Sequence, residues 1–183
     1  MPGWRNSCES WGWLAILLHW VTAVILIGLY FLGLYMVDLS YYDSWYHRAP
    51  FWHRSLGLAV GLLIVFRLVW RVVDGRPKVL DRHQPWEQSI AKFVHALLYL
   101  FSLVICISGY LISTADGTAV SFFDLFDIPS VIEGVDNLED RAGEVHAWLA
   151  DALMVLVALH ALAALKHHYI DRDNTLRKML GVP

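Results

Sequence analysis

Four long stretches of the chain are almost entirely apolar, and most polar residues lie between them. The stretches are Trp13–Val37, Phe51–Val73, Ala91–Ile112 and Gly143–Leu165. An α-helix needs about 20 mostly apolar residues to cross the hydrocarbon core of a bilayer, and each stretch is long enough. None of them alternates polar and apolar residues with the period of two that is typical of a strand. The pattern therefore predicts four membrane-spanning helices.

The composition agrees with a membrane protein. Of the 183 residues, 57% are apolar and 17% are charged, and the mean hydropathy is +0.48. Soluble domains have about 45–50% apolar and about 25% charged residues, so a disordered chain and a nucleic-acid-binding protein are excluded. The length predicts one domain over residues 1–183. We expect the first apolar stretch to be a helix and not a cleaved signal peptide, because it is too long and no small-residue cleavage site follows it.

The positions of the basic residues predict the orientation. If the N-terminus is cytoplasmic, eleven of the fourteen Lys and Arg residues lie inside, as the positive-inside rule requires. The inside set is Arg5, Arg67, Arg71, Arg76, Lys78, Arg82, Lys92, Lys166, Arg172, Arg177 and Lys178, and the outside set is Arg48, Arg54 and Arg141. With the acidic residues included, the net charge is +5 inside and −8 outside. Both termini are therefore expected in the cytoplasm.

The one long connection, Ser113–Ala142, lies outside in this orientation. Residues 121–128 mix aromatic with acidic side chains, and Pro129 follows them. Either a short element lying on the outer membrane surface or a plain solvated loop fits this composition.

Histidines are the candidate functional residues. Those inside the apolar stretches are His19, His53, His95, His146 and His160, and His167 and His168 follow the fourth stretch. His47 and His83 are in connections, where we expect ordinary solvated side chains. Ionisable groups are costly inside a bilayer, so those present usually face the bundle interior and mark a functional site.

The spacing of the histidines pairs them by depth. His146 and His160 are 14 residues apart, which places them within ~40° of one helix face and roughly 21 Å apart along the axis. The topology puts His19 at the depth of His160, in the inner half, and His53 at the depth of His146, in the outer half. Two pairs at two depths are typical of two haem groups with bis-histidine iron ligation. Interhelical hydrogen bonds, a membrane scaffold and a transition-metal transporter are the alternatives, although metal transport usually needs carboxylate or sulfur ligands at the same depth.

Four further residues fit a bundle with haem in its core. Arg67, 14 residues after His53, could pair with propionates of the inner haem or extend to the membrane surface. Gly57 and Gly61 leave room for a neighbouring helix or for a flat macrocycle. Asp151 could carry protons near the outer haem or hydrogen-bond a ligand histidine.

Several short motifs together resemble one family. They are Leu18-His19-Trp20, His53 with Gly57 and Arg67, His95-x-x-x-Tyr99, Trp148 soon after His146, and the tail Leu159-His160-x6-His167-His168-Tyr169-x3-Asp173-Asn174-Thr175-Leu176-x2-Met179. This pattern resembles the bacterial cytochrome b561 family over essentially the whole chain. These are small dihaem membrane proteins related to the cytochrome b subunits of hydrogenases and formate dehydrogenases.

The resemblance implies an all-α, four-helix, up-and-down transmembrane bundle in the bacterial inner membrane. It implies two haem b groups, one held by His19 and His160 and the other by His53 and His146. It also implies electron exchange with a quinone, ubiquinone or menaquinone, near the inner haem, where His95 and His167 are the candidate neighbours. The expected function is electron transfer between a donor and the quinone pool.

A similar family member acts as a superoxide oxidase, which gives an enzymatic alternative. The outer charge of −8 would repel superoxide and suits a basic soluble partner, such as a c-type cytochrome, or a dehydrogenase on the outer face. The chain departs from the family pattern at Cys106, where a proline is expected in the third helix.

Overall fold

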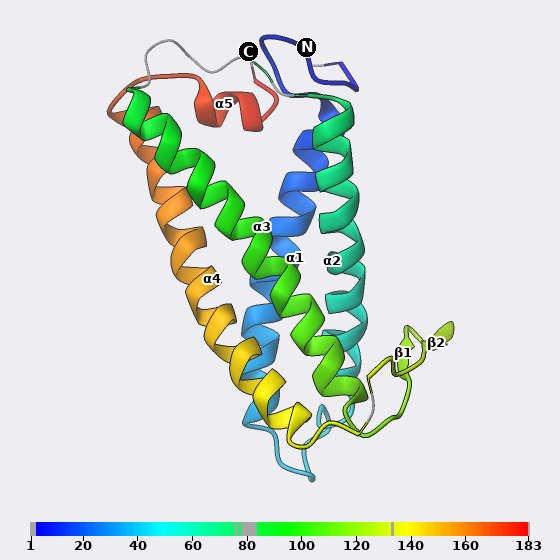
Figure 1. Ribbon diagram of the computed structural model, residues 1–183. Coiled ribbons are helices and arrows are strands. Elements are labelled where there is room, and N and C mark those ends of the chain that lie inside the picture. Colours follow the sequence, from blue (N-terminus) through cyan, green and yellow to red (C-terminus); the bar gives the residue numbers. More distant parts are fainter. Residues whose placement is uncertain (1–2, 76, 78–83, 133, 183) are drawn as a thin grey trace.

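Four long helices lying side by side dominate the computed structural model, which describes residues 3–75, 77, 84–132 and 134–182 (Figure 1). They are α1 (Trp13–Val37), α2 (Arg48–Val73), α3 (Pro85–Thr114) and α4 (Leu138–Tyr169). All four are long and apolar enough to cross a membrane. The predicted all-α transmembrane bundle is confirmed, and α1 has the bounds of its apolar stretch.

The other three helices are longer than the apolar stretches that predicted them, because polar residues continue them at their ends. At the start of α3, Glu87 Oε2 accepts a hydrogen bond of 3.1 Å from the backbone N–H of Gln84, within a capping box, and Pro85 is the first helical residue. Both features are signals of a helix start. Helix α3 therefore begins six residues before the apolar stretch at Ala91.

The helices run up and down, and each packs on its neighbour in sequence. Helix α1 packs on α2, α2 on α3 and α3 on α4, whereas α1 and α4 hardly meet at the level of the backbone. Both termini lie at one end of the bundle (Figure 1). We call this the termini end, which the charges predict to be cytoplasmic, and the opposite end the hairpin end.

The interior is only partly filled by side chains. Leu29, Val60 and Ile64 form a small buried cluster, against which Tyr99 and Cys106 of α3 pack. Many large apolar side chains on the helices point outward, and 18-residue windows in the four helices are only 6–22% buried. Outward apolar faces suit contact with lipid.

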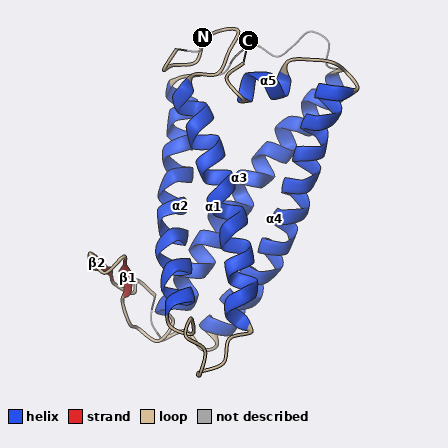
Figure 2. Cartoon of the chain, turned by 180° about the vertical axis from the view of Figure 1, so that it is seen from behind, coloured by secondary structure: helices blue, strands red, loops and turns tan. Residues whose placement is uncertain are grey.

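The long connection contains a β-hairpin, which the sequence did not predict. Strand β1 (Val120–Phe122) pairs antiparallel with β2 (Phe126–Ile128), and the hairpin projects sideways from the bundle (Figures 1 and 2). Phe123 and Asp124 in its turn adopt left-handed backbone angles, φ 52° and 56°. The backbone N–H of Phe123 donates a 3.1 Å hydrogen bond to Oγ of the buried Ser55, which fastens the turn to α2.

Short segments cover the termini end. Helix α5 (Thr175–Met179) follows α4, and the indole N–H of Trp20 donates to the carbonyl oxygen of Met179 at 2.8 Å. The basic residues Arg76, Lys78 and Arg82 and the loop histidine His83 lie outside the described residues.

Candidate functional site

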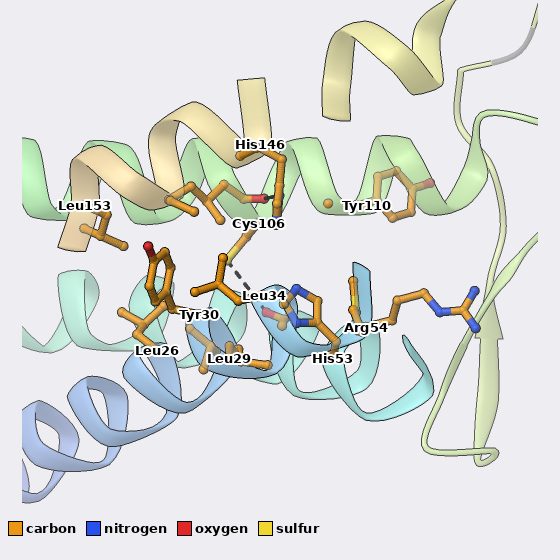
Figure 3. Close-up of a pocket in the computed structure, with 18 of the residues that line it drawn as sticks. Leu26, Leu29, Tyr30, Leu34, His53, Arg54, Cys106, Tyr110, His146 and Leu153 are labelled. Atoms are coloured by element: carbon orange, nitrogen blue, oxygen red, sulfur yellow. Dashed lines mark hydrogen bonds between the residues drawn. The ribbon is translucent and has the colours of Figure 1, made fainter. Parts of the chain in front are cut away.

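His53 of α2 and His146 of α4 face one cavity near the hairpin end (Figure 3). Their ring centres are 6.0 Å apart, with an angle of 62° between the ring planes. A metal–imidazole nitrogen bond is about 2 Å long, so a metal ion held between two facing imidazoles separates their ring centres by roughly 6 Å. The spacing of this pair therefore fits bis-histidine ligation.

The surroundings of His146 leave one ring nitrogen for a metal. Nδ1 of His146 is 3.0 Å from the carbonyl oxygen of Ile105 and 3.2 Å from Oγ of Ser108. Ser108 Oγ itself donates to the Ile105 carbonyl, so the network assigns the histidine proton to Nδ1. A ligating histidine usually donates its second ring N–H to such an acceptor, which leaves Nε2 as the metal ligand.

Two glycines lie directly against the two rings. A Cβ on Gly109 would lie 3.0 Å from Cε1 of His146, and a Cβ on Gly33 would lie 3.3 Å from Cε1 of His53. Any larger residue would displace these rings. Nδ1 of His53 is buried without a hydrogen-bond partner in the described part of the chain.

The cavity between these histidines has a volume of about 290 Å³ and is lined by all four long helices. Its walls are largely apolar, as expected for a cofactor site. The structure separates the roles of the two glycines on α2. Gly57 lines the cavity, and a Cβ placed on it would meet nothing within 4 Å, whereas a Cβ on Gly61 would lie 3.5 Å from Cβ of Cys106 on α3. Gly57 thus leaves room for a flat group, and Gly61 allows close packing of α2 on α3.

A second group of histidines lies toward the termini end. The ring centres of His19 (α1) and His160 (α4) are 6.3 Å apart, at an angle of 69°, which matches the spacing of the first pair. His95 of α3 also belongs to this group, with its ring centre 5.2 Å from that of His160. The two pairs inferred from depth are therefore neighbours in space, and the termini-end group holds three imidazoles.

Arg67 points into the bundle at the second histidine group. One of its terminal nitrogens is 2.8 Å from Nδ1 of His19, and its guanidinium carbon is 5.5 Å from the ring centre of Tyr99. This position differs from the extension to the membrane surface that was the alternative from the sequence. A guanidinium can only donate, so Nδ1 of His19 is the acceptor in this contact.

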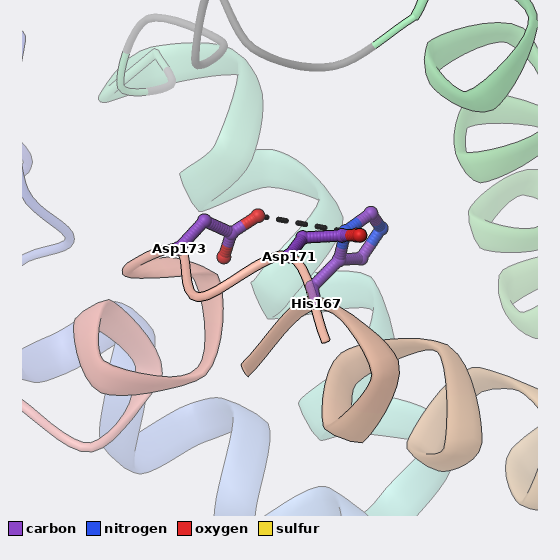
Figure 4. A group of neighbouring side chains, drawn as sticks. All are labelled: His167, Asp171 and Asp173. Atoms are coloured by element: carbon purple, nitrogen blue, oxygen red, sulfur yellow. Dashed lines mark hydrogen bonds and ion pairs between the residues drawn. The ribbon is translucent and has the colours of Figure 1, made fainter. Parts of the chain in front are cut away.

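His167 belongs to a polar cluster with Asp171 and Asp173, after the apolar stretch of α4 that ends at Leu165 (Figure 4). Its Nδ1 is 2.7 Å from Oδ2 of Asp171 and 3.4 Å from Oδ2 of Asp173. Lys166 Nζ lies 2.8 Å from both Asp171 Oδ2 and Glu87 Oε1. The hydrogen bond from Lys166 lowers the pKa of Asp171, and the hydrogen bond from His167 lowers it further.

This cluster includes acidic partners that our reading of the sequence missed. His167, Asp171 and Asp173 place one potential ligand atom each within 4.8 Å of one another. The sequence did contain a signal for this contact, because Asp171 follows His167 by four residues. The ammonium of Lys166 already pairs with Asp171, which disfavours a metal ion at this cluster.

Asp151 also lines the hairpin-end cavity, and its partner was not foreseen. The hydroxyl of Tyr30 on α1 donates a 2.9 Å hydrogen bond to Oδ1 of Asp151 on α4. The bond connects two helices whose backbones hardly meet. Asp151 therefore holds α1 and α4 together beside the cavity.

Known proteins match nearly the whole chain in sequence. The family model for prokaryotic cytochrome b561 matches residues 10–182. The chain is 45% identical to cytochrome b561 homolog 2 of Escherichia coli strain K12 over 176 residues, which are 96% of this chain and 94% of that protein. It is 28% identical to a probable superoxide oxidase, CybB, of Yersinia pestis, over 89% of this chain and 97% of that protein.

The family match agrees with the geometry of the structure: four helices long enough to span a membrane, two histidine pairs with the spacing of metal ligation, and a cavity lined in part by glycines. A multi-pass bacterial membrane protein that transfers electrons and binds haem b accounts for all three features. The chain belongs to the prokaryotic cytochrome b561 family.

Proposed function

We propose that the chain holds two haem b groups and transfers electrons between a donor at the hairpin end and the quinone pool. His53 and His146 would ligate one iron, and His19 and His160 the other. The spacing of 6.0 Å and 6.3 Å between the ring centres of the two pairs is the observation that carries the proposal.

Haem b supplies a one-electron redox centre when bound, and the chain's own residues set where it sits and what surrounds it. Ile105 and Ser108 fix the orientation and tautomer of His146. Gly57 leaves space for a flat ring. Along α4, His146 and His160 are roughly 21 Å apart, and this rise would set the two centres one above the other across the bilayer.

We infer a quinone site beside the second histidine group, at the termini end. His95 lies against His160, and His167 follows about two turns later on the same helix. Reducing a quinone to a quinol takes two electrons and two protons. His167 Nδ1 and Asp171 Oδ2, 2.7 Å apart, form a pair that could hand a proton to a quinone oxygen at this end. The quinone would be ubiquinone or menaquinone.

The charges support an orientation with the termini end in the cytoplasm and the acidic hairpin end outside. A basic soluble protein, such as a c-type cytochrome, or a dehydrogenase would then be the donor. Electrostatic steering by an acidic face favours a positively charged partner and weakens as salt is added.

Superoxide oxidation is the second candidate function, because a relative at 28% identity is named a probable superoxide oxidase. Two superoxide ions would release two electrons and two molecules of dioxygen, and one quinone would take up both electrons with two protons. The net charge of −8 at the hairpin end opposes the approach of this anion.

Counting haem in single variants tests the assignment. We expect the purified wild-type protein to hold two haem b groups, and His53→Ala or His146→Ala to hold one. His19→Ala or His160→Ala should also hold one, with a different absorption maximum. His47→Ala, in the loop before α2, is the control and should keep two. A wild-type content of zero or one, or two haems retained in His53→Ala, would contradict the assignment.

A kinetic test separates the two functions. Quinone reduction by superoxide in detergent, abolished in His19→Ala, would establish the oxidase. The protein is an electron carrier if superoxide does not reduce the quinone, whereas a reduced basic cytochrome does so at a rate that falls as salt is added.

A further inference from the structure

Two arginines of α2 lie over the same aromatic ring near the termini end. Arg67 and Arg71 are four residues apart and therefore share one face of the helix. Their guanidinium carbons are 5.5 Å and 5.6 Å from the ring centre of Tyr99 on α3. Two permanent positive charges are thus held close together by one side chain within the bundle.

Among the residues that the structure describes, neither arginine has a carboxylate partner. Arg67 donates to the neutral imidazole of His19, and Nε of Arg71 is buried without a hydrogen-bond acceptor. A buried charge is stable only when it is paired and hydrogen-bonded. The described chain leaves both cations without an anion, so the pair is suited to an anion from outside the chain.

The arginine pair lies beside the second histidine group. Arg67 contacts His19. Tyr99 is one turn after His95 on α3, and the ring centre of His95 lies 5.2 Å from that of His160. An anionic group carried by a ligand between His19 and His160 would therefore come within reach of both guanidinium groups. Planar guanidinium groups match carboxylates, with which they form two parallel hydrogen bonds.

We propose that Arg71, together with Arg67, binds the two carboxylates of the haem held between His19 and His160, an inference that rests on the proposed function. Arg71 would hold one propionate and Arg67 the other, with Tyr99 fixing the spacing of the two guanidinium groups. The same donors would also suit a phospholipid phosphate, and the test below distinguishes the two sources.

The contact between Arg67 and His19 gives this proposal a structural consequence. His19 Nδ1 accepts from Arg67, so a neutral His19 carries its proton on Nε2. Ligation through Nε2 requires that proton to move to Nδ1, and a guanidinium cannot accept a hydrogen bond from it. With haem bound through Nε2, Arg67 would no longer hydrogen-bond His19, and a propionate would offer it a new acceptor.

The test measures the potential of the termini-end haem in holoprotein. His53→Ala provides a background with that haem alone, in nanodiscs of phosphatidylcholine. We compare Arg71→Gln and Arg71→Lys with Arg48→Gln, a control at the other end of α2. Removing a positive charge beside the haem disfavours its reduced form, and we expect the reduction equilibrium constant to fall roughly tenfold in Arg71→Gln. This fall corresponds to ~59 mV for one electron.

Arg71→Lys keeps the charge and should recover most of the potential, while Arg48→Gln should leave it unchanged. Loss of the termini-end haem in Arg71→Gln, with the haem retained in Arg71→Lys, would also support the proposal. An unchanged potential in Arg71→Gln overturns it. If Arg71 instead binds a phospholipid phosphate, Arg71→Gln should leave the haem potential unchanged. It should then lower the melting temperature in phosphatidylglycerol nanodiscs and not in phosphatidylcholine nanodiscs. A wild-type protein without two haems would overturn the proposed function itself, which is a separate outcome.

Discussion

Nδ1 of His146 lies 3.0 Å from the carbonyl oxygen of Ile105, so a residue of α3 decides which nitrogen of an α4 histidine faces the cavity. The helical carbonyl is fixed in place, and it can only accept a hydrogen bond. Helix packing therefore sets the tautomer of the histidine before any ligand binds. The same helix limits the position of the ring through Gly109, which lies directly against it.

Gly109→Ala should displace His146. The added Cβ would lie 3.0 Å from Cε1 of His146 and 3.3 Å from its Nδ1, and both contacts are too short for the ring to stay where it is. Overpacking of this kind typically costs about 1–3 kcal/mol. We expect the haem content of the purified protein to fall from two toward one. Gly28→Ala, on α1 with nothing within 4 Å of the new Cβ, should keep two. Equal haem content in both variants would contradict the role of Gly109.

Gly57→Leu should block the hairpin-end cavity. Gly57 lines the cavity of about 290 Å³, and a Cβ at this position would meet nothing within 4 Å, so a larger side chain would extend into the cavity. The leucine would occupy the volume that the haem needs, and the content should fall to one with little loss of thermal stability. Gly28→Leu is the matched control. A full complement of haem in Gly57→Leu would mean that the macrocycle lies elsewhere.

Tyr30 and Asp151 should act as a unit. Their hydrogen bond of 2.9 Å joins α1 to α4 beside the cavity. Tyr30→Phe removes the donor and Asp151→Asn removes the charged acceptor, so each should lower the melting temperature. The double variant should be no less stable than the less stable single variant, because groups that share one interaction are not additive. Tyr35→Phe, at an exposed position on α1, is the control. Additive losses would show that the two residues act independently.

The sequence could predict the four helices and the pairing of histidines because both depend on regular geometry. A span needs a fixed length of apolar residues, and positions 14 residues apart return to nearly the same helix face. The depth of His19, His53, His146 and His160 therefore followed from topology alone. The structure brings each pair together, although the ligands remain a proposal.

Partners that depend on helix rotation and on loop geometry could not be predicted in the same way. Two examples are the hydrogen bond of Tyr30 to Asp151 and the stacking of Arg71 over Tyr99. Each joins two different helices, and the sequence separation of such partners follows no helical period. The hairpin at 120–128 was missed because its strands are only three residues long, and its turn residues Phe123 and Asp124 carry no glycine signal.

Asp74 fastens the N-terminal segment to the end of α2. Its Oδ2 accepts a 2.7 Å hydrogen bond from the backbone N–H of Asn6, and its Oδ1 lies 2.6 Å from Nε of Arg5. The Asn6 N–H, followed by Arg5, holds the pKa of Asp74 below its ordinary value of 3.8. The carboxyl therefore stabilises this contact above the ordinary pKa, and the contribution is lost as the pH falls through the lowered value.

Asp74→Asn should remove that pH dependence. In the wild type, amide hydrogens of residues 6–12 should be protected from exchange near neutral pH, after correction for the intrinsic rate. Their protection should decrease only as the pH falls below the ordinary pKa of 3.8 and through the lowered pKa of Asp74, where the carboxylate takes up a proton. In Asp74→Asn the protection should already be low at neutral pH and should not change with acid. Asp38→Asn, at the end of α1, is the control and should behave as the wild type. Equal protection of residues 6–12 in Asp74→Asn and the wild type would show that the carboxylate does not fasten the segment.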